Sequence, residues 1–372
     1  MRFKKPIVYI FSVFILFLIL MYIKNRHIDS NAETTRNLQV AVSNTSNAVP
    51  NQNEIVIVVV SCGMRQQETL NLLKSAIIFG LEHRLRFVVI TEDNLMAGFR
   101  EKLEDWSNIV KNKFTYEVLP LTFPKENEGE WRNLFKPCAA QRLFLPAILT
   151  DIDSVLYLDT DTLFISPVHD VWKFFQEFNS SQIAALSPEH EDENVGWYNR
   201  FSRHPYYGKL GVNSGVMLMN LTRMREFKWN LYMLPLYKEY KLKITWGDQD
   251  LINILFAYYP DKLHIFECQF NYRPDHCMYM SVCDAPHGIQ IVHGNRGYFH
   301  SEKQPVFSTI YRLIEEYQLG TDIYRNIVAP LESAFASEDI RHTSCGKITD
   351  KFLKILKQTF QENTLYYDED SS

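Results

Sequence analysis

The amino-acid sequence predicts an α/β fold built on a mixed, mostly parallel sheet. Ile55–Val60 is a run of β-branched residues typical of a buried strand, Thr69–Phe79 carries apolar residues at helical spacing, and Phe87–Ile90 is another short apolar run. A strand, a helix and a strand within roughly 35 residues predict a parallel pair joined by a right-handed crossover. With 46% hydrophobic and 14% aromatic residues, the chain can fill a large core.

The same patterns continue along the chain. Further strands are expected at Phe114–Leu121, Val155–Leu158, Ile183–Leu186, Asn213–Asn220 and Ile289–Val292. Helices are expected at Ala97–Lys113, at Trp131–Leu149 with interruptions at prolines, from Pro167 with an apolar stripe ending at Phe178, from Trp246–Asp250 onward, and at Phe352–Phe360. Neither G-x-G-x-x-G nor the P-loop pattern occurs, so a nucleotide would have to be held in another way.

An apolar run near the N-terminus predicts a membrane anchor. Ile7–Ile23 is at the short end of the roughly 17–25 residues that span a bilayer, and basic residues flank it. A cleaved signal peptide is the alternative, but Lys24-Asn-Arg26 is not a small-residue cleavage site. The expected organisation is a cytosolic tail (1–6), an anchor (7–23), a polar stem (24–53), a folded domain (54–345), and a C-terminal helix with an acidic tail (346–372).

This topology is single-pass type II and places the folded domain in the lumen of the endoplasmic reticulum or Golgi. Three N-x-[ST] sequons, at Asn44, Asn179 and Asn220, agree with that location. The net charge of −5 gives no reason to expect a nucleic-acid partner.

Six cysteines, at positions 62, 138, 268, 277, 283 and 345, form an even set for an oxidising compartment. Disulfides are therefore expected, and the spacing leaves their connectivity open. A zinc site formed by Cys268, His276, Cys277 and Cys283 is an alternative, although their spacing matches no common zinc pattern.

Two carboxylates follow the predicted strand Val155–Leu158, at Asp159 and Asp161. Ligands bind at strand ends in open α/β sheets, and divalent cations prefer clustered carboxylate oxygens. The pair is therefore a candidate metal site, with an ordinary strand end as the alternative. Arg142 lies among apolar neighbours and is either a snorkelling arginine or a ligand for phosphate or sugar. Asp248 and Asp250 have a sufficient structural explanation as acids in a first helical turn.

Four features in a fixed order resemble a known family: the β-branched first strand, Asp-x-Asp after Tyr157-Leu158, the stretch 213–220 with Asp248-Gln-Asp250 after it, and His293-Gly294 after a strand. This order resembles the retaining glycosyltransferases that include glycogenin and the bacterial lipopolysaccharide galactosyltransferases. Within them, the sequence is most similar to the animal glucoside xylosyltransferases. The stretches that carry this closer similarity are 135–145, 196–201, 204–208, 244–250 and 271–276.

The resemblance implies a single nucleotide-sugar-binding, Rossmann-like glycosyltransferase domain and a set of site residues. It implies that Mn²⁺ (or Mg²⁺) is bound by Asp159, Asp161 and His293, and that Asp248 and Gln249 act in catalysis. The donor-binding residues that it implies are Ser61, Cys62, Arg142, Asp159, Asp161, Asn213, Ser214, Gly215, Asp248, Gly294 and Arg296. Aromatic residues that can stack on an acceptor sugar are Trp197, Tyr207 and Trp246.

The implied activity is the retaining transfer of xylose from UDP-xylose, in α1,3 linkage, to O-linked glucose on EGF repeats such as those of Notch. Gln249 is a poor nucleophile, which favours attack of the acceptor on the face that the leaving group departs from. A glucosyl- or galactosyltransferase of the same fold is one alternative. A haloacid-dehalogenase-like phosphatase with Asp159 as nucleophile is another, and a non-catalytic lectin is a third.

Overall fold

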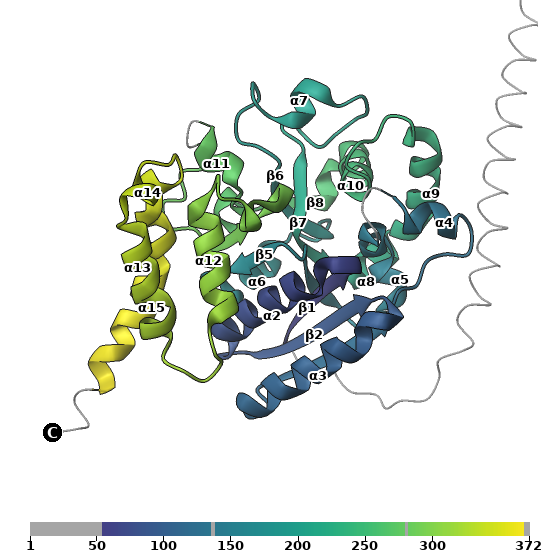
Figure 1. Cartoon of the computed structure of the whole chain (residues 1–372). Coiled ribbons are helices and arrows are strands. Elements are labelled where there is room, and N and C mark those ends of the chain that lie inside the picture. The colour runs from purple at the N-terminus through teal and green to yellow at the C-terminus, as the bar shows by residue number, and fades with distance from the viewer. Residues whose placement is uncertain (1–53, 135–137, 280–281, 368–372) are drawn as a thin grey trace, which may run out of the picture. The chain divides into compact units, whose positions relative to one another are not determined.

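The structure is a computed structural model that describes residues 54–134, 138–279 and 282–367, which fold around a seven-stranded sheet (Figure 1). The strands are β1 (Glu54–Ser61), β2 (Arg84–Thr91), β3 (Phe114–Pro120), β4 (Ser154–Leu158), β5 (Thr162–Phe164), β6 (Ala184–Pro188), β7 (Val212–Asn220), β8 (Leu263–Ile265) and β9 (Ile291–His293). The earlier α-helices are α2 (Gln66–Gly80), α3 (Asp93–Ile109), α4 (Glu128–Arg132), α5 (Leu145–Ile148), α6 (Val168–Trp172), α7 (Trp197–Phe201), α8 (Leu221–Glu226) and α9 (Trp229–Tyr240). The later ones are α10 (Asp248–Tyr258), α11 (Pro274–Met278), α12 (Pro305–Glu316), α13 (Ala329–Phe335), α14 (Glu338–Arg341) and α15 (Thr349–Tyr367).

The predicted anchor (7–23), stem (24–53), sequon at Asn44 and the end of the acidic tail lie outside the described residues. Among the helices of the described ranges, none combines the length and the apolar character needed to cross a bilayer.

The central sheet has the strand order β3-β2-β1-β4-β7-β6-β8. Strand β7 runs antiparallel to both of its neighbours, β4 and β6, and the other pairings are parallel. This confirms the predicted mixed, mostly parallel sheet. Because β7 is reversed, its first residues reach the same sheet edge as the carboxyl ends of β1 and β4.

Helices cover both faces of the sheet, which explains why the strands read as continuous apolar runs. Ile57 and Val59 of β1 belong to one core cluster, which includes side chains of α2, α3, α12 and α15. Val58 and Val60 belong to a second cluster with side chains of α8, α9 and α10. Successive side chains of one strand therefore serve opposite layers.

Strand β9 pairs with β5 in a separate two-stranded sheet, with Thr162 opposite His293. The expected strand at Ile289–Val292 exists over Ile291–His293, but it is not a strand of the central sheet. Since Thr162 directly follows Asp161, this pairing brings His293 beside the Asp-x-Asp turn.

The segment Trp131–Leu149 is helical and interrupted near Pro146, as expected, but part of it is a 3-10 helix. The described part contains the end of α4, a 3-10 helix over Ala139–Phe144, and α5. Pro146 lies in the first turn of α5, where its missing N–H is tolerated, but it cannot continue a preceding α-helix.

The helix expected from Pro167 is also shorter than its apolar stripe. Helix α6 ends at Trp172, and a 3-10 helix follows over Lys173–Glu177. In this second segment Phe174 is the buried residue, because three residues per turn shift the face that points to the core.

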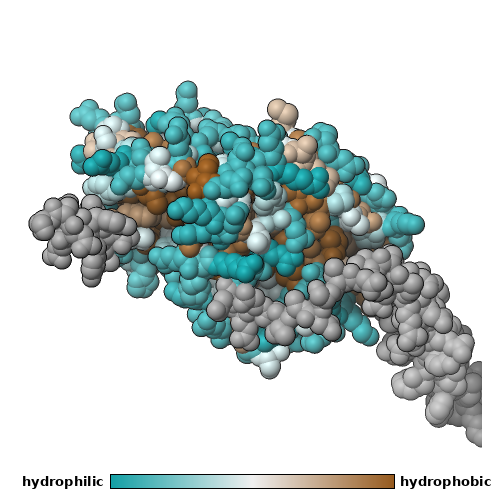
Figure 2. Space-filling view, turned by 90° about the horizontal axis from the view of Figure 1, so that it is seen from below, coloured by the Kyte–Doolittle hydropathy of each residue, from teal (hydrophilic) through white to brown (hydrophobic). Residues whose placement is uncertain are grey.

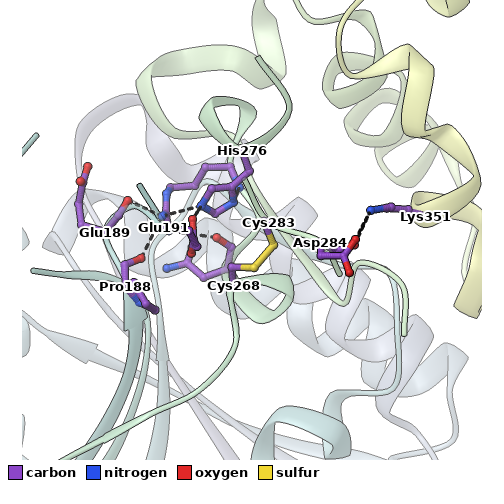
Figure 3. Close-up of a disulfide and its surroundings, with 10 residues drawn as sticks. Pro188, Glu189, Glu191, Cys268, His276, Cys283, Asp284 and Lys351 are labelled. Atoms are coloured by element: carbon purple, nitrogen blue, oxygen red, sulfur yellow. Dashed lines mark hydrogen bonds and ion pairs between the residues drawn. A yellow bond between two sulfur atoms is a disulfide. The ribbon is translucent and has the colours of Figure 1, made fainter. Parts of the chain in front are cut away.

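All six cysteines are paired, as Cys62–Cys138, Cys268–Cys283 and Cys277–Cys345. The alternative zinc site is therefore wrong, since three of its four residues are cysteines bonded in two disulfides. Figure 3 shows the Cys268–Cys283 bond, with His276 above it and the Asp284–Lys351 ion pair on its other side. Cys62–Cys138 joins the end of β1 to the segment that carries Arg142.

The C-terminal helix α15 packs against the elements that carry β9. Phe352 is buried and lies 5.5 Å, ring to ring, from Tyr272, which bridges to Val292. The Ile289 N–H donates to the Lys351 carbonyl, 3.0 Å between N and O. The face of the molecule in Figure 2 is mostly hydrophilic with separate apolar patches, as is usual for a globular surface.

Candidate active site

A pocket of about 410 Å³ opens at the sheet edge where β1 and β4 end and β7 begins. This is the edge at which α/β sheets bind ligands. The predicted site residues that line it are Cys62, Arg142, Asp159, Asp161, Asn213, Ser214, Trp246, Asp248, Gln249, His293 and Arg296. Ser61, Gly215, Gly294, Trp197 and Tyr207 do not line it.

Asp159, Asp161 and His293 form a cluster that can hold a metal ion. One ligand atom from each lies within 4.8 Å of the others. Nε2 of His293 is 3.3 Å from Oδ1 of Asp161. The backbone fixes the arrangement, because the Gly294 N–H donates to the Asp161 carbonyl and the Asp159 N–H donates to the Gly215 carbonyl, each over 2.8 Å.

A chain of hydrogen bonds sets the tautomer of His293. The Gly215 N–H and Nδ2 of Asn271 both donate to Oδ1 of Asn213, at 3.0 and 2.9 Å. This leaves Oδ1 of Asn271 to accept from Nδ1 of His293, at 2.8 Å. Nδ1 therefore carries a proton, and Nε2, 3.3 Å from Asp161, is the ring nitrogen available to a metal ion. Two carboxylates and one imidazole fit Mn²⁺ or Mg²⁺ better than a soft cation.

Gly215 makes room for His293. A Cβ atom at this position would lie 2.2 Å from Cε1 and 2.6 Å from Nδ1 of the imidazole. No larger residue fits without moving the ring, so the glycine acts through His293 rather than by lining the pocket.

Arg142 is buried behind the metal cluster, so the snorkelling interpretation is wrong. Its guanidinium pairs with Asp159, at 3.1 Å, and with Asp248, and it lies 4.5 Å above the ring of Tyr157. Burial alone would lower the pKa of Arg142, but the two carboxylates raise it, so the group stays charged. Burial raises the pKa of Asp248, while Arg142 opposes that shift.

Helix α10 delivers Asp248 and Gln249 to the pocket. It begins after Gly247, which has φ 60° and ψ −116°, a conformation that favours glycine. Oε1 of Gln249 accepts from the N–H and the hydroxyl of Ser214, at 3.0 and 3.2 Å. The side chain therefore ties α10 to the start of β7.

The two predicted donor residues at the end of β1, Ser61 and Cys62, have other partners. Ser61 is buried, and its hydroxyl accepts from Thr69, at 2.9 Å. Cys62 lines the pocket as one half of the disulfide with Cys138. Arg296, at the opposite side, is half exposed and 3.3 Å from Asp275.

Two of the three predicted acceptor aromatics pack against each other. Trp197, which opens α7, packs edge-on against Trp246 with ring centroids 5.5 Å apart. Tyr207 is partly buried against the second core cluster. Only Trp246 of the three reaches the pocket lining.

Three residues at or near the pocket were not predicted from the sequence as site residues: Arg65, Glu189 and Asn271. Arg65 lines the pocket and pairs with the buried Glu68. Glu189 follows β6 at the same sheet edge, so the strand-end argument used for Asp159 would have pointed to it. Asn271 carried no local signal, because its partners are 22 and 58 residues away in sequence.

The backbone at Glu189 is bound by a buried arginine. The buried guanidinium of Arg273 donates to the carbonyls of Pro188 and Glu189, at 3.0 and 2.6 Å. Figure 3 shows the Glu189 carboxylate pointing away from the Glu191–His276 pair. Burial raises the pKa of Glu189 to about 7, against the opposing charge of Arg273.

The sequence matches the family described as glycosyl transferase family 8 over residues 99–294. Glucoside xylosyltransferase 2 of Mus musculus is 49% identical over 327 residues, which cover 84% of this chain and 73% of the relative. Glucoside xylosyltransferase 1 of Homo sapiens is 50% identical over 319 residues, which cover 82% and 71%. The galactosyltransferase LgtC, solved with donor and acceptor sugar analogs, matches with a TM-score of 0.55 at 17% identity, covering 73% of this chain and 99% of that chain, which shows a shared fold.

The fold, the pocket and these similarities define an enzyme that transfers a sugar, a glycosyltransferase. The chain belongs to glycosyl transferase family 8. This confirms the resemblance found in the sequence and decides against the phosphatase and the lectin.

We expect Gly215→Ala to reduce Mn²⁺ affinity by about tenfold or more, because the added methyl displaces His293 from the carboxylates. Titration of Mn²⁺ by electron paramagnetic resonance measures this directly. Gly129→Ala is the matched control, since a Cβ there meets nothing within 4 Å. Unchanged Mn²⁺ affinity in Gly215→Ala would contradict the arrangement described for His293.

We expect Glu189→Gln to raise the free energy of unfolding, relative to wild type, more at pH 8 than at pH 5. The folded-state pKa of about 7 lies above the usual value of 4.5, so the folded state binds more protons than the unfolded state between these values. The wild-type free energy of unfolding therefore falls as pH rises through this window, by on the order of 2 kcal/mol, and stays lower above it. Urea unfolding at both pH values measures the effect, with Glu193→Gln, an exposed carboxylate of the same loop, as control. Equal pH dependence in Glu189→Gln and wild type would contradict it.

Proposed function

We propose that this enzyme transfers xylose from UDP-xylose, with retention, in α1,3 linkage to glucose O-linked to EGF repeats of Notch-type glycoproteins. The observation that carries the proposal is one pocket that contains both the Asp159–Asp161–His293 cluster and the buried Arg142–Asp248 ion pair. The Asp159–Asp161–His293 cluster suits a cation bound to a diphosphate, and the Arg142–Asp248 ion pair suits sugar hydroxyls. The similarity to glucoside xylosyltransferases supports the choice of donor and acceptor sugars.

A divalent cation, Mn²⁺ or Mg²⁺, held by Asp159, Asp161 and His293 would offset the negative charge that develops on the UDP diphosphate as the sugar leaves. The fit rests on the chemistry of the donor set, two carboxylates and an imidazole. Arg65 and Arg296 lie on the pocket wall and add positive charge for the nucleotide phosphates.

The reaction is a same-face substitution. The bond between C1 of xylose and the phosphate oxygen breaks with its electron pair going to the phosphate, O3 of the acceptor glucose bonds to C1 on that face, and the O3 proton passes to the leaving phosphate. Asp248 is committed to Arg142, and Oε1 of Gln249 already accepts two hydrogen bonds from Ser214. Neither side chain is placed as a free nucleophile, so both orient the donor sugar instead.

The acceptor enters beside Trp246, with Trp197 packed against that ring and Glu189 on the pocket wall. Flat aromatic rings suit the apolar face of a sugar. The donor-binding set inferred from the family, Ser61, Cys62, Arg142, Asp159, Asp161, Asn213, Ser214, Gly215, Asp248, Gly294 and Arg296, acts partly by contact and partly by shaping the pocket.

The enzyme acts in the lumen of the endoplasmic reticulum or Golgi, anchored by residues 7–23 with the stem 24–53 beyond them. Three disulfides in the folded region support an oxidising compartment. Asn179 is exposed and accessible for glycosylation. Asn220 caps α8 by accepting from the Arg223 N–H, so its glycosylation would alter that cap.

The full-length chain, purified in detergent with Mn²⁺, is tested against a panel of UDP-sugars with an EGF repeat bearing O-glucose. We expect a pentose mass gain from UDP-xylose alone, lost with EDTA, and reduced at least about a hundredfold in Asp161→Asn because the cation loses a charged ligand. A hexose gain would overturn the choice of donor. A protein that binds Mn²⁺ and UDP but transfers nothing to this EGF repeat would overturn the acceptor.

A further inference from the structure

Tyr198 connects the loop that follows β6 to the helix that carries Gln249. It lies in α7, is 1% exposed, and does not line the pocket. Its hydroxyl contacts three side chains of α10: Oδ1 of Asp250 at 2.8 Å, Nδ2 of Asn253 at 2.9 Å and Nε2 of Gln249 at 3.2 Å. One phenol oxygen thus meets three residues spread over the first two turns of that helix.

The donors and acceptors in this network admit one consistent arrangement. The carboxylate of Asp250 can only accept, so the Tyr198 hydroxyl donates to it. The lone pairs of the hydroxyl then face the amide groups of Gln249 and Asn253. Nδ2 of Asn253, which has two hydrogens, also lies 2.8 and 3.0 Å from the carbonyl oxygens of Val212 and Gln249. At the other end, the Ser214 N–H can only donate, so it requires the oxygen of Gln249. The carboxamide of Gln249 is therefore fixed at both ends, with oxygen toward β7 and nitrogen toward α7.

The carboxylate of Asp250 also binds the backbone next to Trp246, on the side of the pocket proposed for the acceptor. Oδ2 of Asp250 accepts from the N–H groups of Thr245 and Trp246, at 2.6 and 2.7 Å. His204, from the loop that contains Tyr198, lies 3.4 Å from this oxygen. Trp246 lines the pocket, so one buried network joins it to Gln249 through Asp250 and Tyr198.

The ring of Tyr198 is fixed independently of its hydroxyl. A Cβ atom at Gly211 would lie 2.3 Å from Cδ2 of the ring, so the chain passes directly against it before β7 begins. Trp197, His204 and Tyr206 surround the ring at centroid distances of 5.2, 6.0 and 5.4 Å. Removal of the hydroxyl alone therefore leaves the ring packed.

We propose that Tyr198 is a positioning residue for sugar transfer. Its hydroxyl fixes the orientation of the Gln249 carboxamide and, through Asp250, connects it to the segment before α10 that contains Trp246. The inference rests on the proposed function of the pocket. Without the hydroxyl, the amide nitrogen of Gln249 loses its partner and the carboxamide can rotate away from the position that faces the donor sugar. Transfer then slows, while the groups that hold the nucleotide are untouched.

Steady-state kinetics of Tyr198→Phe in the full-length chain test the role, with UDP-xylose and a glucosylated EGF repeat. We expect kcat to fall about tenfold while the KM for UDP-xylose stays within about twofold, because the lost hydrogen bond orients the sugar and not the nucleotide. Hydrolysis of UDP-xylose per transfer is expected to rise. Tyr206→Phe, which removes a hydroxyl from the same aromatic cluster, is expected to leave all three quantities within about twofold of wild type.

A kcat within about twofold of wild type in Tyr198→Phe, or a loss confined to the donor KM, overturns the proposal. Equal kcat losses in Tyr198→Phe and Tyr206→Phe also overturn it, since they would reflect the cluster and not the hydroxyl. If the wild type transfers no xylose, the proposed function fails, and the contact is judged by a measurement that needs no activity.

That measurement is a double-mutant cycle on thermal unfolding with Tyr198→Phe and Gln249→Ala. Since both variants break the same hydrogen bond, we expect the Tm loss of the double variant to be smaller than the sum of the two single losses. Tyr206→Phe combined with Gln249→Ala is expected to be additive. Additive losses for Tyr198 and Gln249 would overturn the link between them.

Discussion

Three carboxylates meet at one edge of a buried sheet, and the rest of the site has to offset their mutual repulsion. Asp159 and Asp161 follow β4, and Asp248 begins α10. The buried guanidinium of Arg142 lies between Asp159 and Asp248, and it offsets part of this charge where water cannot. The remaining charge faces the pocket beside the imidazole of His293, which is a setting that favours a divalent cation.

The topology of the chain explains how residues far apart in sequence reach this edge. The reversal of β7 brings Asn213 and Ser214 to the edge where β1 and β4 end. The small β5–β9 sheet places His293 opposite the residue that follows Asp161. Helix α15 packs against the elements that carry β9, so it supports the histidine, although none of its residues among those described lines the pocket.

The sequence predicted six of the seven strands of the central sheet, all but β8, and the helices α2 and α10, because each has a local signal, an apolar run or a helical period. Local signals also pointed to Asp159, Asp161 and Arg142, whereas the family resemblance supplied most of the other pocket-lining residues. The sequence did not predict Asn271, Gly215 as a spacer for His293, or the network of Tyr198. These residues act through partners that are distant in sequence and come together only in the folded chain. Tyr198 and Asp250, for example, are 52 positions apart. The interruption near Pro146 was predicted, but the 3-10 helix before it was not, because the apolar spacing is similar in α-helical and 3-10 segments over one turn.

Pulsed electron paramagnetic resonance of the protein with Mn²⁺ and UDP tests the central claim most directly, since an imidazole nitrogen bound to Mn²⁺ modulates the electron spin echo. We expect nitrogen modulation in the wild type and its loss in His293→Gln, with no loss in His287→Gln, a substitution of an exposed histidine. Mn²⁺ that binds with UDP but shows no nitrogen modulation, or the same modulation in His293→Gln, would contradict the cluster of Asp159, Asp161 and His293 as the metal site.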